Sequence, residues 1–123
     1  MTALEQILAK LRKELAGVFV STDIVGMDGL SIAGGSIDPA FDATAASARF
    51  ATVAKLGKEI SEKLQLGEMD DLLITTDQVY IIQRLIGDGS YYWGLAVSKD
   101  ATLGMVRLLM KEYVGEIWKA IPK

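Results

Sequence analysis

Two glycine-containing turns separate the apolar runs of this chain and predict the order of its elements. Asp28-Gly29 stands between a run rich in Val, Ile, Phe and Thr and a shorter returning run, and Gly87-Asp88-Gly89 joins two further runs. An Asp-Gly pair between such runs is a strong hairpin signal. Amphipathic helical patterns occupy both ends and the middle of the chain. The predicted order is helix, strand, strand, helix, strand, strand, strand, helix, in a single domain that spans residues 1–123.

The first helix is predicted to begin at Thr2 and to end at Gly17. Thr2 and Glu5 have the spacing of a capping box, which satisfies backbone N–H groups at a helix start. Glycine is a preferred residue just past a helix end. Between these signals, apolar residues recur at helical spacing and predict one buried face: Leu4, Ile7, Leu8, Leu11 and Leu15.

A β-hairpin is predicted after the first helix. Residues 18–27 form its first strand and residues 30–33 its second, which Gly34-Gly35 ends. We expect both Asp28 and Gly29 to have positive φ, because a tight two-residue hairpin turn requires this at both central positions.

A long helix is predicted from Asp38-Pro39 to about Gln65, with Gly67 just past its end. Its expected core-facing row is Ala46, Phe50, Val53, Gly57, Ile60 and Leu64. A second, nearly uncharged patch on its first half consists of Thr44, Ala45, Ala48, Ala51 and Thr52. Two interpretations of this patch remain open. Alanine is the best helix former and needs no further reason, but small residues also allow a close contact with another subunit.

Three consecutive strands are predicted in the second half of the chain: residues 70–76, Val79 to Ile86 and Tyr91 to Ser98. Both faces of the middle strand are apolar, so the sheet should be covered on both sides. The long helix can cover one face and the two terminal helices the other. This pattern predicts a three-layer α+β fold, which is α/β in the broad sense of mixed helix and sheet.

The final helix is predicted to begin at Asp100 or Thr102. Its broad apolar stripe consists of Leu103, Val106, Met110, Tyr113, Val114, Ile117 and Ile121. Outside this stripe lie Met105, Leu108 and Leu109. They could form a surface that binds a partner, or they could be apolar residues exposed singly, which are common on protein surfaces.

The composition argues against catalysis and against several kinds of partner. The chain has no His and no Cys, so it has no imidazole base, thiol nucleophile, disulfide or zinc finger. We therefore expect no catalytic residue, no cofactor and no metal site, and we expect that the protein is not an enzyme. A net charge of −3 without a basic stripe argues against nucleic-acid binding. Neither a signal peptide nor a membrane-length apolar run is present, so we expect a cytoplasmic location and no membrane insertion.

Two groups of residues have both a functional and a structural interpretation. Each of the four arginines, Arg12, Arg49, Arg84 and Arg107, could act as an arginine finger on a partner's phosphoryl transfer, but a surface charge or ion pair is the favoured interpretation. The aromatic residues Tyr91, Tyr92 and Trp93 could form a ligand-stacking platform, but packing under a helix is favoured.

Several stretches in this order resemble the Roadblock/dynein light chain family over about residues 3–118. They are residues 15–18, residues 27–33, the Ala-rich helix, residues 66–68, residues 85–89 and residues 100–104. The resemblance implies a five-stranded antiparallel sheet related to the longin and profilin folds. It also implies a homodimer in which one strand pairs with its own copy, with the long helices side by side. That strand falls here on Asp71, Leu72, Leu73, Ile74 and Thr75.

The resemblance further implies a regulator or scaffold of a small Ras-like GTPase, similar to bacterial activators of a polarity and gliding-motility GTPase. We expect the docking surface on the long helix, with Arg49 and Lys55 as polar contacts. Two alternatives remain open. One is a structural subunit of a larger assembly without a GTPase partner, and the other is a small-molecule sensor that uses the space under the aromatic strand.

Overall fold

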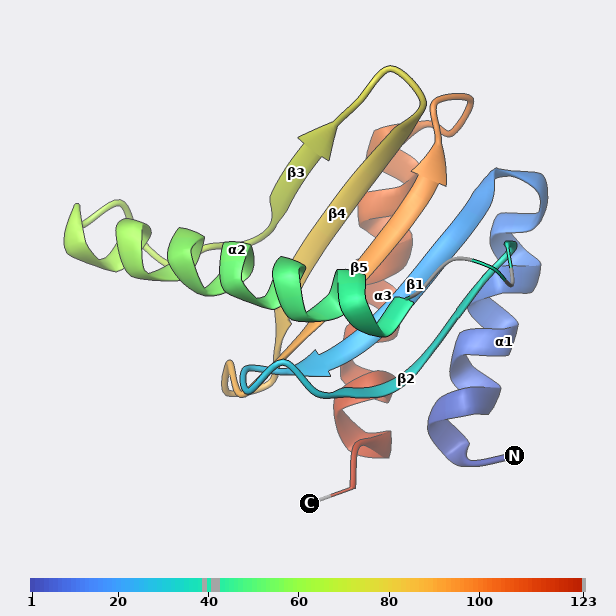
Figure 1. Ribbon diagram of the computed structural model, residues 1–123, viewed down its shortest axis with the longest axis horizontal. Helices are drawn as coiled ribbons and strands as arrows, with labels where there is room; N and C mark the ends of the chain where they lie inside the picture. Colours follow the sequence, from blue (N-terminus) through green and yellow to red (C-terminus); the bar gives the residue numbers. More distant parts are fainter. Residues whose placement is uncertain (39, 41–42, 123) are drawn as a thin grey trace.

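The computed structural model describes residues 1–38, 40 and 43–122, with the side chains of residues 43, 44 and 47 left out. Its helices are α1 (Ala3–Leu15), the short 3₁₀ helix η1 (Ala16–Val18), α2 (Ala43–Lys63) and α3 (Leu103–Ala120). Its strands are β1 (Phe19–Gly26), β2 (Ser31–Ser36), β3 (Leu72–Thr75), β4 (Val79–Ile86) and β5 (Tyr91–Ser98). The strands form one antiparallel sheet in the order β2-β1-β5-β4-β3 (Figure 1). The predicted five-stranded α+β fold is confirmed.

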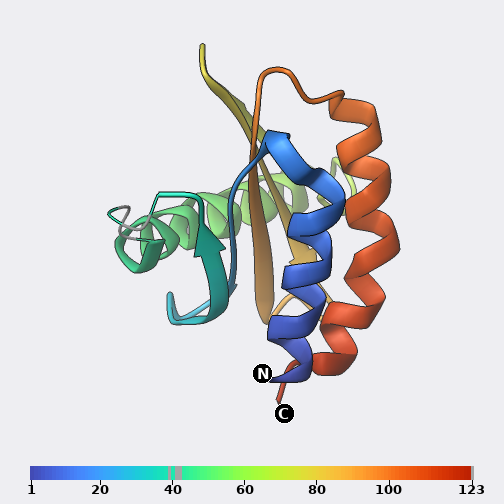
Figure 2. The same ribbon diagram turned by 90° about the vertical axis from the view of Figure 1, so that its right-hand side faces the viewer.

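The sheet is covered on both faces, as the apolar pattern predicts. α1 and α3 lie side by side on one face, and α2 crosses the other (Figure 2). The larger core lies under α1 and α3 and contains Leu11, Trp93 and Ile117, each 0% exposed. A smaller core under α2 contains Val25, Ala51, Ala54 and Tyr92.

Both ends of α1 lie close to the predicted positions. The hydroxyl of Thr2 accepts a hydrogen bond from the backbone N–H of Glu5 at 3.1 Å, as expected for an N-cap. The helix ends at Leu15, and Ala16 rather than Gly17 has positive φ, at 49°.

The first hairpin turn differs from the expected two-residue form. Gly29 has a φ of 90°, whereas Asp28 does not have positive φ. The N–H of Gly29 bonds the carbonyl of Gly26 at 2.9 Å, and the Asp28 carboxylate accepts from the N–H of Leu30 at 3.0 Å. The aspartate therefore stabilises the turn through its side chain, and only the glycine needs the left-handed region.

Gly34-Gly35 does not end the second strand, contrary to the prediction. Both glycines lie inside β2, where Gly34 pairs with Asp23 of β1. A Cβ atom on Gly34 would lie 2.6 Å from the carbonyl oxygen of Thr22 and 2.6 Å from the Asp23 carboxylate. Glycine is needed here because the neighbouring strand approaches too closely for any side chain.

The long helix begins later than predicted and ends within two residues of the expected position. Pro39 lies outside the described residues, and the Asp38 carboxylate accepts from the N–H of Ala40 at 2.9 Å. At the other end, Gln65 has a φ of 53°. The N–H of Leu66 bonds the carbonyl of Ser61 at 2.9 Å, and together these features form a Schellman cap.

The expected core-facing row of α2 is right for half of its members. Ala46, Phe50 and Gly57 are half-buried, and Phe50 packs against the smaller core. Among the side chains of this helix that the structure describes, Ala51 and Ala54 are the buried ones, at 4% and 1% exposure. Val53, Ile60 and Leu64 are instead 40%, 46% and 64% exposed. Helical spacing marks an apolar face but does not say which element covers it. The small residues face the sheet because they let the helix pack closely against it.

Candidate functional site

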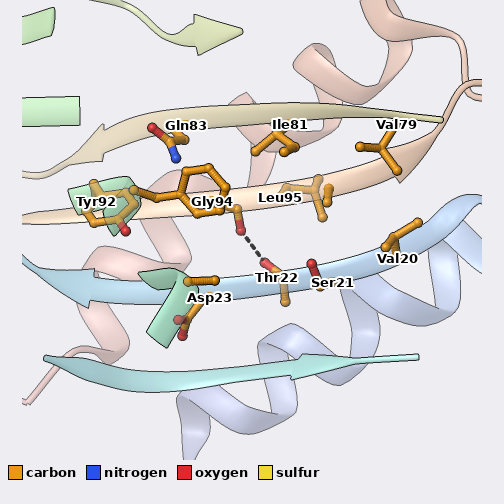
Figure 3. Close-up of a pocket in the computed structure, with 13 residues that line it drawn as sticks. Val20, Ser21, Thr22, Asp23, Val79, Ile81, Gln83, Tyr92, Gly94 and Leu95 are labelled. Carbon is orange, nitrogen blue, oxygen red and sulfur yellow. Dashed lines mark hydrogen bonds between the residues drawn. The ribbon is translucent and has the colours of Figure 1, made fainter. Parts of the chain in front are cut away.

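A cavity of about 280 Å³ lies between α2 and the middle of the sheet. Its floor is formed by β1, β5 and β4, and Ala46 and Phe50 of α2 line one side. Val79, Ile81 and Gln83 follow one another along β4 on the cavity face, and Val20 and Asp23 lie on β1 (Figure 3). The space is therefore mainly apolar, with polar groups at one end.

Asp23, Gly94 and Gln83 lie in one row across three adjacent strands. Gly94 of β5 pairs with Asp23 on one side and with Gln83 on the other. Strands in a sheet are spaced 4.7–4.9 Å apart, so the backbones of Asp23 and Gln83 are separated by roughly 10 Å. The residue between them is glycine, which adds no side chain of its own there, and the nearest side-chain atom to the position of its missing Cβ is Cε2 of Tyr92 at 4.0 Å.

Gln83 is fully buried, at 0% exposure. Neither its amide nitrogen nor its amide oxygen has a hydrogen-bond partner within the described part of the chain. A buried polar group without a partner costs about 1–3 kcal/mol. This amide is therefore an unusual feature on the cavity side of β4, where its neighbours along the strand are Ile81 and Leu85.

Asp23 supplies a second polar group with spare bonding capacity. Its Oδ1 accepts from the Ser31 hydroxyl at 2.5 Å, while its Oδ2 is buried with no partner among the described residues. Burial raises the pKa of this carboxyl from 3.8 to about 6, although the bonds from Ser31 and the N–H of Ile24 act in the opposite direction. The same carboxylate adds to the effect of burial in raising the pKa of Tyr92.

The polar groups of the site can form hydrogen bonds. Across residues 1–38, 40 and 43–122, no group of three or more Asp or Glu side chains could hold a metal ion. Nor does any helix in these ranges have the length and apolar character needed to cross a bilayer. Sequence reasoning missed Asp23, Gln83 and Gly94 as a group. The available signal was a lone amide in β4 and a lone glycine in β5, both inside apolar strands.

Comparison with known proteins shows what this architecture resembles. No protein-family model matches the chain, and no curated protein sequence matches it. Solved structures do match: MglB from Myxococcus xanthus has a TM-score of 0.86 and 16% identity, over 97% of this chain and 94% of that one. The chain has the Roadblock/LC7 fold.

Two further structures place the likeness over nearly the whole chain. A Roadblock/LC7 domain from Streptomyces avermitilis matches with a TM-score of 0.81 and 16% identity, over 92% of each chain. An MglB structure with a tetrameric arrangement matches with a TM-score of 0.82 and 13% identity, over 98% of this chain and 90% of that one. At these identities the likeness concerns the fold.

In this Roadblock/LC7 fold, the strand expected at the dimer interface is an edge strand. β3 pairs with β4 and ends the sheet on that side. Leu72, Leu73 and Ile74 are half-buried, and Thr75 is exposed. Asp71 precedes the strand, and its carboxylate is held by two hydrogen bonds from Arg107 of α3, at 2.9 and 3.0 Å. The edge is therefore anchored to the helix behind it.

The small-residue patch expected on α2 does not form one surface in the Roadblock/LC7 fold. Ala45, Ala48 and Thr52 are exposed, whereas Ala51 is buried at 4% exposure against the sheet. The side chain of Thr44 lies outside the described residues. Ala51 is thus a core residue, and its inclusion in an intersubunit patch was wrong.

The expected polar contacts Arg49 and Lys55 are both exposed on α2 but point in different directions. They are six positions apart, which places them roughly 120° apart around the helix. Lys55 lines a groove between α2 and the turns that follow β1 and β4, together with Lys58 and Glu59. Arg49 is not part of that groove, so the structure does not bring the two together.

The other arginines have structural contacts. Arg12 lies over the ring of Phe19 at 5.0 Å, Arg84 approaches Asp70 at 3.7 Å, and Arg107 binds Asp71. These contacts confirm the ion-pair or surface-charge interpretation for Arg84 and Arg107.

The aromatic strand is packed rather than open. Tyr92 and Trp93 are 1% and 0% exposed. Trp93 faces α1 and α3, where its indole N–H donates to the hydroxyl of Thr22 at 2.8 Å. The packing interpretation is confirmed for these two residues.

Proposed function

We propose that this chain is a cytoplasmic homodimeric interaction module that regulates or scaffolds a small Ras-like GTPase and is not itself an enzyme. The observation that carries the proposal is an exposed apolar row on α2, beside a free sheet edge, in a Roadblock/LC7 fold. The row consists of Val53, Leu56, Ile60 and Leu64. The neighbours named MglB and the resemblance of the sequence to bacterial gliding-motility activators support a GTPase as the partner.

The free edge supports self-pairing through β3. An apolar edge strand that stays unpaired is an aggregation hazard, and pairing with a second copy removes it. The residues proposed at this contact are Asp71, Leu72, Leu73, Ile74 and Thr75. Antiparallel pairing would relate the two copies by a two-fold axis normal to the sheet, so both α2 helices would lie on the same face of a continuous sheet.

The position of α2 supports the same dimer. Its C-terminal half projects past β3, beyond the sheet of its own chain (Figure 1). Every member of the row is exposed, at 40% for Val53, 53% for Leu56, 46% for Ile60 and 64% for Leu64. In the proposed dimer, this overhanging half would lie over the partner copy and cover its own apolar row.

The dimer is tested by placing a charge on the overhanging helix. Ile60→Glu should leave the isolated subunit folded, because the side chain is already 46% exposed, and should raise the dimer dissociation constant at least tenfold. Met105→Glu is the matched control, since Met105 is 64% exposed on α3, on the opposite face. Sedimentation equilibrium measures both. An unchanged dissociation constant for Ile60→Glu would reject this interface.

The GTPase partner is tested with the protein as bait. We expect a small GTPase to be recovered preferentially with either a GTP analogue or GDP, and its hydrolysis or exchange rate to change when the purified dimer is added. Reversing the charges of both Arg49 and Lys55 should weaken this interaction, whereas Lys13→Glu on α1 should not. Recovery of large assembly subunits, with nucleotide turnover unaffected, would instead favour a structural subunit.

A further inference from the structure

Two residues that line the cavity under α2 carry buried polar atoms without partners in the described part of the chain. Gln83 is 0% exposed and has no hydrogen-bond partner within the described residues. The Oδ2 atom of Asp23, on the other side of Gly94, is also buried and has no hydrogen-bond partner within the described residues. Buried polar groups in native proteins are nearly always paired, so an unpaired set deserves a specific explanation.

Gly94 is the reason that the space is empty. A Cβ atom at this position would have one neighbour within 4 Å among the described residues, the Cε2 of Tyr92 at 4.0 Å, so an alanine would fit. Glycine weakens the interior of a strand, and its presence there often marks a close approach by a ligand or another chain. Here it opens a gap between the two unpaired groups and leaves its own backbone accessible from the cavity.

The rest of the cavity fits a hydrocarbon body. Val79 and Ile81 continue the row of Gln83 along β4, and Val20 lies opposite on β1 (Figure 3). Phe50 of α2 closes one side. The volume of about 280 Å³ is nearly twice that of an engineered apolar cavity of about 150 Å³ that holds benzene. A ring with a three-atom chain and a small head group therefore fits.

The unpaired atoms define the chemistry of the head group. The nitrogen of Gln83 donates, whereas its oxygen and Oδ2 of Asp23 accept. A ligand must therefore offer an acceptor together with N–H donors. A protonated amine has no acceptor, and a carboxylate has no donor and would place a second negative charge near Asp23. A carboxamide or lactam supplies both kinds of group and no charge.

We propose that this cavity binds a small uncharged molecule with a carboxamide or lactam head between Gln83 and Asp23 and a hydrocarbon body along Val79 and Ile81. None of the residues proposed at the β3 contact or as polar contacts of the GTPase lines this cavity. The cavity does lie on the side of the sheet where the proposed dimer places the partner's α2. A bound ligand contacts both the sheet and Phe50, so it stabilises the packing of α2 against the sheet.

The test uses the full chain and 3-phenylpropanamide as the probe. A ligand that binds only the native state raises the melting temperature, so we expect a concentration-dependent increase at millimolar probe. NMR titration should shift the backbone amide signals of Gln83 and Gly94. At pH 7.5 the matched acid, 3-phenylpropanoate, should bind at least tenfold more weakly because of its charge.

Two substitutions give the proposal a specific control. Gln83→Met keeps the length of the side chain but removes both bonding atoms, and should weaken binding at least tenfold while the protein stays folded. Gln78→Met, in the exposed turn between β3 and β4, should leave the affinity unchanged. The variants at Arg49 and Lys55 report on the GTPase separately, because neither residue lines the cavity.

Several outcomes would overturn the proposal. They are the absence of any shift at millimolar probe, equal affinities for the amide and the acid, and unchanged affinity in Gln83→Met. A fourth is occupation of the cavity by α2 side chains of a second copy, seen as intermolecular NOEs to Ile81. Any of these results would leave the proposed dimer and its GTPase partner intact.

Discussion

Arg107 of α3 makes a bidentate contact with the carboxylate of Asp71, with Nε and Nη2 at 2.9 and 3.0 Å from its two oxygens. This geometry matches the fixed fork of a guanidinium, which a lysine ammonium does not reproduce. The Asp71 side chain is 13% exposed and the Arg107 side chain 37%, so solvent screens the pair in part. The contact joins the start of edge strand β3 to the helix behind it.

We predict that Arg107→Lys destabilises the chain by about 1 kcal/mol, because a single ammonium replaces a bidentate pair that is partly screened by water. Urea unfolding measures the change. Hydrogen exchange at Leu72 should accelerate more than exchange at Ile82, which is 0% exposed in the middle of the sheet. Lys111→Arg on the same helix serves as the control. A uniform effect across the sheet would show that the pair does not anchor the edge specifically.

Asp23 should make the stability depend on pH. Its folded-state pKa of about 6 lies above its ordinary value of 3.8, so the folded state binds a proton more tightly than the unfolded state. The contribution of this residue to stability is therefore most favourable below about pH 4 and falls as the pH rises to about 6. Asp23→Asn removes the charge. The free energy of unfolding of this variant, relative to that of the native chain, should therefore increase by about 1–3 kcal/mol as the pH rises across this window. Thermal unfolding at a series of pH values measures this difference. A constant difference from pH 4 to 7 would contradict the raised pKa.

Gln83→Met should increase stability when no ligand is bound. The substitution removes an unpaired buried amide and replaces it with an apolar chain of similar length. We expect a gain of about 1–2 kcal/mol in the free energy of unfolding, measured with urea. In contrast, Gln78→Met at an exposed position should change it by less than about 0.5 kcal/mol. A loss of stability in Gln83→Met would mean that the amide has a partner in solution.

Thr22 connects two buried groups through one hydroxyl. It accepts from the indole N–H of Trp93 at 2.8 Å and donates to the carbonyl of Gly94 at 2.9 Å. Thr22→Val keeps the shape but leaves both groups without this partner, so we expect a cost of about 2–3 kcal/mol. Thr22→Ser retains the hydroxyl and should cost less. Denaturation followed by tryptophan fluorescence distinguishes the two variants, and equal costs would show that the methyl group matters more than the hydroxyl.

Local sequence signals were sufficient for most of the fold. The capping residue Thr2, the Asp28-Gly29 turn and the apolar runs predicted the order of the elements, and the bounds of β4 and β5 match residue for residue. These features depend on hydrogen bonds and conformational preferences among residues within a few positions of one another. The three-layer arrangement also followed, because a strand that is apolar on both faces requires two covers.

The tertiary structure decided what local patterns leave open. The spacing on α2 could not show that Ala51 and Ala54, rather than Val53 and Ile60, face the sheet, because that choice depends on how closely the helix approaches the strands. The row of Asp23, Gly94 and Gln83 joins residues 71 and 11 positions apart, and only the strand order places them together. The sequence by itself determined the elements and the absence of His and Cys chemistry. The packing determined which apolar face stays exposed and where a buried polar gap remains.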